Sequence, residues 1–317
     1  MRCEDRSSRA ASPTTGGPLL FQPMSPAQIS QTQYLLDGTT PLYRIGYGAM
    51  RLCDQPGNFG PYPAWEEGIQ LLQQAASLGA GLIDTAHAYG PGWNELLVGD
   101  AFAHSTTRPL IATKGGVEKT APDRILPDGR PATLKRRCKE SLRWLRIPQI
   151  DLYQLHRPDP AVPLQESVGA LKELQDEGII RHIGLSNVSL EQLEQARKIA
   201  KIASVQNRYN ILEPADDAIV DHCNTLGIAF LPWGPLAAKP FAKEAPLAAH
   251  PQLAPLAASL KTSPATLALA WLLHRSPNII LIPGTTSSHH LAENFSASSI
   301  QLSQEQFALL SSSLKTS

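Results

Sequence analysis

Short apolar runs alternate with helical patterns along most of this chain, and this alternation limits the possible folds more than any other feature. Runs of four to eight apolar residues bounded by turn signals are typical of buried strands. Strands that alternate with helices favour a parallel sheet, and eight such units predict closure into an α/β fold of the (β/α)₈ TIM barrel type. The eight predicted strands are Leu42–Gly46, Gly81–Asp84, Leu110–Thr113, Asp151–Leu155, Ile179–Gly184, Ala203–Gln206, Ile228–Leu231 and Ile279–Ile282.

Helical signals fall between these runs. The apolar residues of 164–174 recur at spacings of four, three and three, and Gly178 follows as a stop. Ser189 and Gln192 predict a capping box at the start of a helix over Ser189–Ala200. Ser263 followed by Pro264 predicts the first residues of a helix that runs through Leu273.

An open, doubly wound sheet is the alternative arrangement. Its dinucleotide-binding form carries Gly-x-Gly-x-x-Gly after the first strand, whereas Ile45-Gly-Tyr-Gly-Ala-Met50 has only the first two glycines. Before this segment, the run from Gln33 to Thr40 reaches Asp37-Gly38, which is typical of a β-hairpin. We therefore favour a barrel with an N-terminal β-hairpin.

Residues 1–30 differ from the rest of the chain. They are rich in Ser, Pro, Gly and Arg and have no periodic apolar face, which predicts a disordered N-terminal extension before a single barrel domain over 31–317. They also lack the apolar core of a secretory signal. A transit peptide is the alternative, but Glu4 and Asp5 argue against it.

Composition excludes several classes of protein. Lys and Arg number 28, as do Asp and Glu, so net charge indicates neither nucleic acid nor a membrane surface as a partner. No apolar stretch approaches the roughly 20 residues of a membrane helix. The cysteines Cys3, Cys53, Cys138 and Cys223 are widely separated, which argues against a metal site or a disulfide framework and favours a cytoplasmic location.

Four polar residues lie at or just after the ends of predicted strands. They are Asp84, Tyr89, Lys114 and His156. The carboxyl ends of barrel strands meet on one face, where such folds place their chemistry. Together these side chains are suited to reducing a carbonyl, because the oxygen that gains negative charge needs a proton.

Each of the four has a predicted role. A free phenol has a pKa of about 10, too high for easy donation at neutral pH. The ammonium of Lys114 would lower the pKa of Tyr89, the general acid, and Asp84 would hold Lys114 charged. His156 would orient the substrate carbonyl by a hydrogen bond.

Residues 33–310 resemble the aldo-keto reductase family. The resemblance rests on Gly81-Leu-Ile-Asp-Thr-Ala-His-Ala-Tyr-Gly90 with Glu95, Leu155-His156, Gly184-Leu-Ser-Asn187, and Ile282-Pro-Gly-Thr through Glu293-Asn294. It implies a (β/α)₈ barrel that binds NADP(H) across its C-terminal face and takes a small carbonyl substrate. It also implies Tyr89 as the general acid.

The resemblance implies a set of cofactor-binding residues. Ser186, Asn187 and Gln206 match positions that hydrogen-bond the nicotinamide carboxamide, and Trp233 matches an aromatic ring stacked on it. Gly234, Pro235 and Leu236 would shape the pyrophosphate loop. The segment after the eighth strand would hold a phosphate and the adenine of the cofactor, with Glu293 and Asn294 near the adenine. Its candidates are Gly284, Thr285, Thr286, Ser287, His290, Glu293 and Asn294.

This segment departs from the commonest family pattern at two positions. A Lys that often holds the 2′-phosphate is replaced by Gly284, and an Arg that often stacks on adenine is replaced by His290. The hydroxyls of Thr285, Thr286 and Ser287 remain to bind phosphate. The departure predicts weaker selectivity for NADPH over NADH.

Substrate choice is expected to depend on the loops. Phe59, Tyr62 and Trp93 are candidates for an aromatic slot. The runs Ile45–Leu52 and Asn58-Phe-Gly-Pro61 resemble a bacterial branch that includes pyridoxal reductases. The loop Gly115–Arg130 follows the strand that carries Lys114.

We therefore expect a cytoplasmic, monomeric, metal-independent enzyme that reduces an aldehyde or ketone with NADPH. One alternative is a pyridoxal reductase (pyridoxine 4-dehydrogenase) in particular. Another is an NADP(H)-sensing regulatory subunit with little turnover, since the same fold serves as a channel-associated partner in some relatives.

Overall fold

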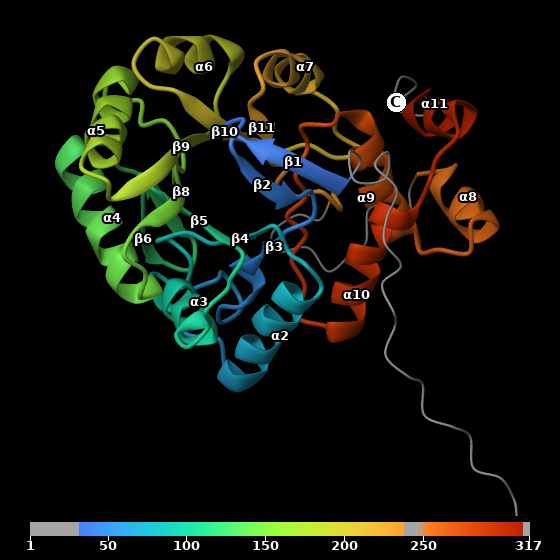
Figure 1. The fold of residues 1–317 in the computed structure, drawn as a ribbon, viewed down its shortest axis with the longest axis horizontal. Coiled ribbons are helices and arrows are strands. Elements are labelled where there is room, and N and C mark those ends of the chain that lie inside the picture. The colour runs from blue at the N-terminus through green and yellow to red at the C-terminus, as the bar shows by residue number, and fades with distance from the viewer. Residues whose placement is uncertain (1–31, 238–246, 248–249, 313–317) are drawn as a thin grey trace, which may run out of the picture.

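The structure is a computed structural model, and it describes residues 32–237, 247 and 250–312. A seven-stranded parallel sheet curls into a barrel, and helices surround it (Figure 1). The order of the strands is β11-β10-β9-β8-β5-β4-β3. Their bounds are β3 Tyr47–Gly48, β4 Leu82–Asp84, β5 Leu110–Gly115, β8 Ile150–Leu155, β9 Ile180–Ser186, β10 Ile202–Gln206 and β11 Ala229–Phe230.

An eighth segment closes the barrel between its two edges. Ile280 N donates to Phe230 O over 2.9 Å on the β11 side. Leu281 N donates to Arg44 O, and Gly46 N donates to Leu281 O, both over 2.8 Å, on the β3 side. These bonds confirm the predicted (β/α)₈ barrel.

One predicted strand proves to be two. The run Leu42–Gly46 joins the end of β2 (Thr40–Tyr43) to the start of the first barrel strand, which pairs from Ile45 onward. Leu42 and Ile45 are both buried, but in different clusters, Leu42 inside the barrel and Ile45 between barrel and helices. An apolar run alone does not mark the bend between two consecutive buried strands.

The predicted N-terminal hairpin is present and lies across one end of the barrel (Figure 1). Strand β1 (Gln33–Leu36) pairs with β2 through a turn in which Asp37 and Gly38 both have positive φ, 56° and 73°. Such a turn matches the twist of a hairpin. Leu36 and Leu42 pack into the inner cluster with strand residues such as Leu82, so the hairpin fills this end of the barrel.

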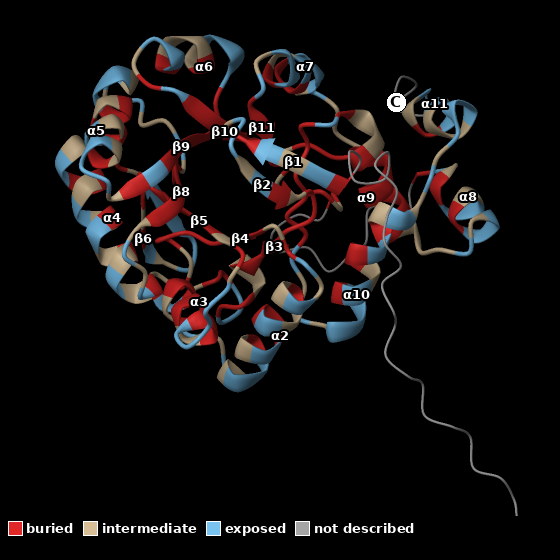
Figure 2. Cartoon of the chain, in the orientation of Figure 1, coloured by how far each residue is buried: buried red, intermediate tan, exposed pale blue. Residues whose placement is uncertain are grey.

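Helices cover the outside of the sheet with their apolar faces turned inward (Figure 2). The predicted capping box at α6 is confirmed, since Ser189 Oγ accepts from Gln192 N over 3.1 Å and Gln192 Oε1 accepts from Ser189 N over 2.9 Å. The helices are α2 Trp65–Ser77, α3 Trp93–Phe102, α4 Pro131–Leu145, α5 Leu164–Asp176, α6 Leu190–Arg197, α7 Asp217–Thr225, α8 Leu253–Ser259, α9 Pro264–Arg275, α10 Ser288–Ser296 and α11 Gln304–Ser312, with short 3₁₀ turns η1 Ala49–Arg51 and η3 Ala297–Ser299.

The loop after β5 contains a second hairpin that the sequence did not predict. It consists of β6 (Val117–Ala121) and β7 (Arg124–Pro127). Every residue of β7 is exposed or only partly buried, so the strand lacks the alternation that would mark it.

Across residues 32–237 and 250–312, no single helix is long and apolar enough to cross a membrane. The pair α8 and α9 meets that criterion jointly, by length and composition alone, with a bend of 95° between the two helices.

The expected extension over residues 1–30 lies outside the described residues. We predict that deleting it leaves the melting temperature and the activity unchanged, because it carries no periodic apolar face to bury. Thermal unfolding of the full and shortened chains, followed by circular dichroism, checks this. A melting temperature lower by several degrees in the shortened chain would show that the segment docks on the barrel.

Candidate active site

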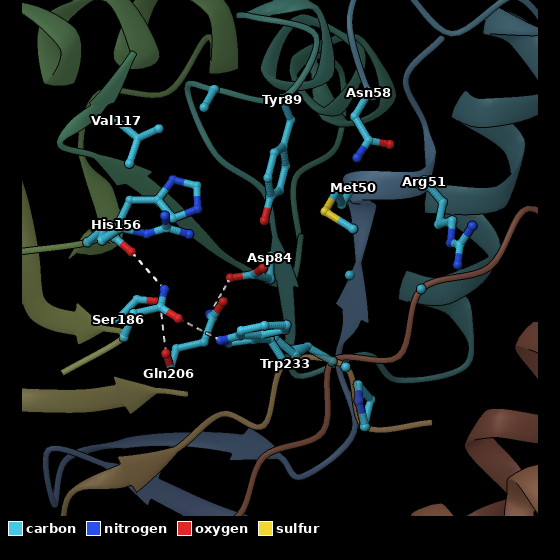
Figure 3. Close-up of a pocket in the computed structure, with 18 of the residues that line it drawn as sticks. Met50, Arg51, Asn58, Asp84, Tyr89, Val117, His156, Ser186, Gln206 and Trp233 are labelled. Carbon is cyan, nitrogen blue, oxygen red and sulfur yellow. Dashed lines mark hydrogen bonds between the residues drawn. The ribbon is translucent and has the colours of Figure 1, made fainter. Parts of the chain in front are cut away.

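A cavity of about 360 Å³ opens at the C-terminal ends of the barrel strands (Figure 3). Asp84, Ser186 and Gln206 end strands β4, β9 and β10, and all three line it. Tyr89 and His156, which follow β4 and β8, line it too. The barrel thus brings together side chains that are more than 100 positions apart in sequence.

Lys114, from β5, is the centre of a buried polar cluster beside this cavity. Its Nζ donates to Asp84 Oδ2 over 2.7 Å, to Thr85 O over 2.8 Å and to Tyr89 Oη over 3.3 Å. Lys114 is 1 % exposed and Asp84 is 3 % exposed. Charges this deep are tolerated only when they are paired, so each of the two requires the other.

The second oxygen of Asp84 is occupied as well. Asp84 Oδ1 accepts from Gln206 Nε2 over 2.9 Å and from Gln154 Nε2 over 3.3 Å. Gln154 was not among the predicted site residues. The sequence spacing could have indicated it, because Gln154 and His156 are two positions apart and residues so spaced face the same side of a strand.

Burial has the largest effect on the pKa of the Tyr89 phenol. It raises the pKa of Tyr89 above its ordinary value, and the nearby charge of Lys114 offsets only part of this rise. The charge of Lys114 acts to lower the phenol pKa, as expected. The overall shift of that pKa is nevertheless upward, contrary to the expectation. Burial also acts to lower the pKa of Lys114, but Asp84 and Tyr89 outweigh it and raise that pKa, so the ammonium stays charged.

His156 lies edge-on beside Tyr89 at the cavity wall (Figure 3), with ring centroids 5.9 Å apart and planes at 85°. Burial, and after it the charge of Lys114, lowers the pKa of His156 well below its usual value. The imidazole is therefore neutral at physiological pH and carries one N–H donor.

The cofactor candidates next to His156 form a connected network. Asn187 Nδ2 donates to His156 O and to Ser186 Oγ, each over 3.0 Å. Ser186 Oγ donates to Gln206 O over 2.8 Å, and Trp233 Nε1 donates to Asn187 Oδ1 over 3.1 Å. These bonds hold the Trp233 ring at the cavity wall (Figure 3). Gly234, Pro235 and Leu236 line the cavity beside it.

Two glycines at the cavity wall, Gly48 and Gly284, let the first barrel strand and the segment after the eighth approach each other closely. A Cβ at Gly284 would lie 2.7 Å from Gly48 O, and a Cβ at Gly48 would lie 2.5 Å from Ile282 O. No side chain fits at either position without moving backbone. At these positions the cavity wall beside Trp233 is bare backbone, which suits a dinucleotide, whose phosphates need close backbone approach.

The remaining cofactor candidates lie around the start of α10. Ser287 Oγ caps this helix by accepting from His290 N over 3.3 Å, and Thr285 O accepts from Tyr47 Oη over 2.5 Å. Thr286 and His290 are exposed, Glu293 is half-buried, and Asn294 is buried. Of this segment only Gly284 lines the cavity itself.

The three predicted substrate-pocket residues lie outside the cavity lining. Trp93 is 45 % exposed and packs edge-on against Trp65, with centroids 6.3 Å apart. Tyr62 packs against Gly68 of α2, and Phe59 is half-buried in its loop. The sequence of a loop does not say which way its aromatic rings point. Other residues of the cavity lining are instead Met50, Asn58, Ala88, Val117, Lys119, Ile125 and Arg157.

Contacts tie this lining to the turn that carries Tyr89. Asn58 O accepts from Gly90 N over 3.0 Å and from Lys119 Nζ over 3.3 Å. Lys119 Nζ also donates to Gly57 O. Lys119 belongs to β6, so the unpredicted hairpin clamps the loop that brings Asn58 to the cavity.

Comparison with protein families and curated sequences gives consistent matches. The model of the aldo/keto reductase family matches residues 44–315. An uncharacterized oxidoreductase of Schizosaccharomyces pombe is 37 % identical over 286 residues, which cover 90 % of this chain and 91 % of that protein. The pyridoxine 4-dehydrogenase of Escherichia coli K12 is 40 % identical over 280 residues, which cover 86 % of this chain and 95 % of that protein.

Solved structures with the same fold include a glycerol dehydrogenase of Gluconobacter oxydans. It has a TM-score of 0.79 at 26 % identity, covering 90 % of this chain and 95 % of its own. An aldo/keto reductase of Klebsiella pneumoniae, solved with NADP and acetate, has a TM-score of 0.74 at 26 % identity. That match covers 88 % of this chain and 94 % of the Klebsiella chain.

Proposed function

We propose, from the premise that this chain belongs to the aldo/keto reductase family, that it reduces an aldehyde or ketone to the alcohol with NADPH. Members of the family are NADP(H)-dependent oxidoreductases that act on small carbonyl compounds. The observation that carries the proposal is the position of Tyr89 Oη, 3.3 Å from the buried Lys114 ammonium on one side and open to the cavity on the other.

The proposed proton donor is Tyr89. When bound, the nicotinamide supplies a hydride, and the carbonyl oxygen then gains negative charge. Burial keeps the phenol protonated until that charge develops, because it holds the pKa of Tyr89 above its ordinary value. As the proton leaves, the ammonium of Lys114 stabilises the phenolate, and Asp84 keeps that ammonium in place.

His156 is proposed to orient the substrate. Its neutral imidazole has one N–H that can donate to the carbonyl oxygen without competing as an acid. Figure 3 shows His156 and Tyr89 on adjoining walls of the cavity, so a single oxygen between them can receive both hydrogen bonds.

The nicotinamide end of the cofactor is proposed to lie against Trp233. The ring is fixed by its bond to Asn187 and offers a flat surface for stacking. Ser186, Asn187 and Gln206 are the proposed partners of the carboxamide. Gln206 Nε2 already donates to Asp84 Oδ1, so its carbonyl oxygen is the end left for the cofactor.

A panel of aldehydes and ketones, with NADPH consumption as the readout, tests the proposal. We expect measurable turnover with several small aldehydes. A protein that binds NADPH but reduces none of them at a useful rate would instead be the sensing subunit.

Pyridoxal is a second candidate at the level of the substrate. It is favoured by the 40 % identity to the pyridoxine 4-dehydrogenase of Escherichia coli. The aromatic slot expected from Phe59 and Trp93 is not available to hold the pyridine ring, because neither residue lines the cavity. Met50 and Val117, which flank Tyr89 in Figure 3, offer apolar contacts instead.

Kinetics separate pyridoxal from generic aldehydes. If pyridoxal is the substrate, its kcat/KM exceeds that of a small aliphatic aldehyde, and Val117→Ala raises KM for pyridoxal more than for the small aldehyde. Phe59→Ala, outside the lining, is the control and changes neither. Equal kcat/KM values for the two aldehydes would reject pyridoxal as the preferred substrate and leave only the assignment as a general carbonyl reductase.

We predict that NADPH is preferred over NADH, with a ratio of kcat/KM between about 10 and 150. One hydrogen bond to a charged group contributes roughly 1.5–3 kcal/mol, which corresponds to that range. A larger ratio would require the Lys and Arg of the commonest family pattern, and this chain has Gly284 and His290 at those positions. A ratio of one or below would show that nothing here recognises the 2′-phosphate.

A further inference from the structure

Arg51 is a cation at the cavity wall that the proposed reaction does not use. It ends the 3₁₀ turn η1, which follows the first barrel strand, and it is half-buried. Among the residues that the structure describes, its guanidinium has no hydrogen-bond or ion-pair partner. Keeping a charge partly out of water without a partner is unfavourable unless a ligand supplies the counter-charge.

Three other cations near the cavity are paired, whereas Arg157, also unpaired among the described residues, is exposed to solvent. Lys114 is paired with Asp84, and Lys119 donates to the carbonyls of Gly57 and Asn58. Arg208 stacks on Trp233 at 5.1 Å, but its guanidinium is paired with Glu213. Arg157 lines the cavity next to His156, whereas Figure 3 shows Arg51 at the opposite end, beyond Met50 and Trp233.

Arg51 lies next to Gly284 at the cavity wall. The Cγ atom of Arg51 is 3.5 Å from the position that a Cβ at Gly284 would take, which is van der Waals contact. A side chain cannot begin at Gly284, because its Cβ would be 2.7 Å from Gly48 O. The stem of Arg51 therefore lies beside Gly284, and it brings to this part of the cavity wall a charge that position 284 cannot carry.

We propose that Arg51 binds a phosphate group of NADP(H) and replaces the missing cation at position 284. The inference rests on the proposed function only in requiring that the protein bind the dinucleotide. A guanidinium presents a planar fork of N–H donors that matches a phosphate, and such charge-assisted contacts are about twice as strong as neutral ones. The first barrel loop, rather than the last, then supplies the charge that holds the cofactor.

Direct binding measurements test this without turnover. The dissociation constants of NADPH and NADH are measured by quenching of tryptophan fluorescence in the wild-type chain, Arg51→Gln, Arg51→Lys and Arg157→Gln. We expect Arg51→Gln to weaken NADPH binding about 10- to 100-fold and to reduce its salt dependence. Arg51→Lys should restore part of the loss, and Arg157→Gln, at the substrate end of the same cavity, should leave both constants unchanged.

The two cofactors distinguish the phosphates. A loss for NADPH alone assigns Arg51 to the 2′-phosphate, and an equal loss for both assigns it to the pyrophosphate; either supports the inference. Unchanged NADPH affinity in Arg51→Gln, with a wild-type melting temperature in the absence of cofactor, overturns it. A wild-type chain that binds neither dinucleotide would overturn the proposed function as well, so the two failures are distinguishable.

Discussion

Tyr89→Phe should reduce kcat for carbonyl reduction about 100- to 10,000-fold and leave NADPH affinity nearly unchanged. Proton transfer by a positioned side chain contributes roughly that factor, and Phe removes the only proton that Tyr89 can give. Lys114 keeps its bonds to Asp84 Oδ2 and Thr85 O, so the buried charge remains paired in the variant. The ring itself still fills its place beside His156.

Single-turnover rates and fluorescence titration with NADPH separate the two effects. Tyr62→Phe is the matched control, since it makes the same chemical change outside the cavity lining and should keep full activity. A folded Tyr89→Phe protein with near-normal kcat would remove the phenol from the mechanism. Weakened NADPH binding with a normal rate at saturation would give Tyr89 a binding role instead.

The barrel and the four proposed catalytic residues could be predicted from the sequence for the same physical reason. Buried parallel strands are nearly continuous apolar runs, so β5 and β8 stand out, and a polar residue at the end of such a run is conspicuous. Strand ends in a closed barrel meet on one face. The positions of Asp84, Lys114 and His156 in sequence therefore implied that they lie together.

The walls of the cavity could not be predicted in this way. They come from the loop around Asn58 and from the β6–β7 hairpin, and Ile125 of that hairpin is 43 % exposed although it lines the cavity. An exposed strand has no burial pattern to reveal it. Arg51 was missed because its importance depends on the approach of Gly48 and Gly284, two segments that meet only when the barrel closes.

Lys114→Met should abolish turnover and lower the free energy of unfolding by about 3–5 kcal/mol, the usual cost of removing one partner from a buried ion pair. The carboxylate of Asp84, 3 % exposed, would keep its bonds to Gln206 and Gln154 but lose its counter-charge.

The pKa of Lys114 is raised in the folded protein. Its charge therefore stabilises the fold at every pH below its ordinary pKa, and that stability is lost only as the pH rises through the folded value. The difference between wild type and variant should hence be constant from about pH 6 to pH 9.

The double variant Lys114→Met with Asp84→Asn separates stability from catalysis. A neutral amide at position 84 needs no counter-charge, so urea unfolding should show much of the lost stability restored, while turnover remains absent because nothing stabilises the phenolate of Tyr89. If the single variant is too unstable to purify, the double variant still reports on catalysis. Wild-type stability in Lys114→Met would show that Asp84 does not need the ammonium. Activity in the double variant would show that the Tyr89 proton can leave without it.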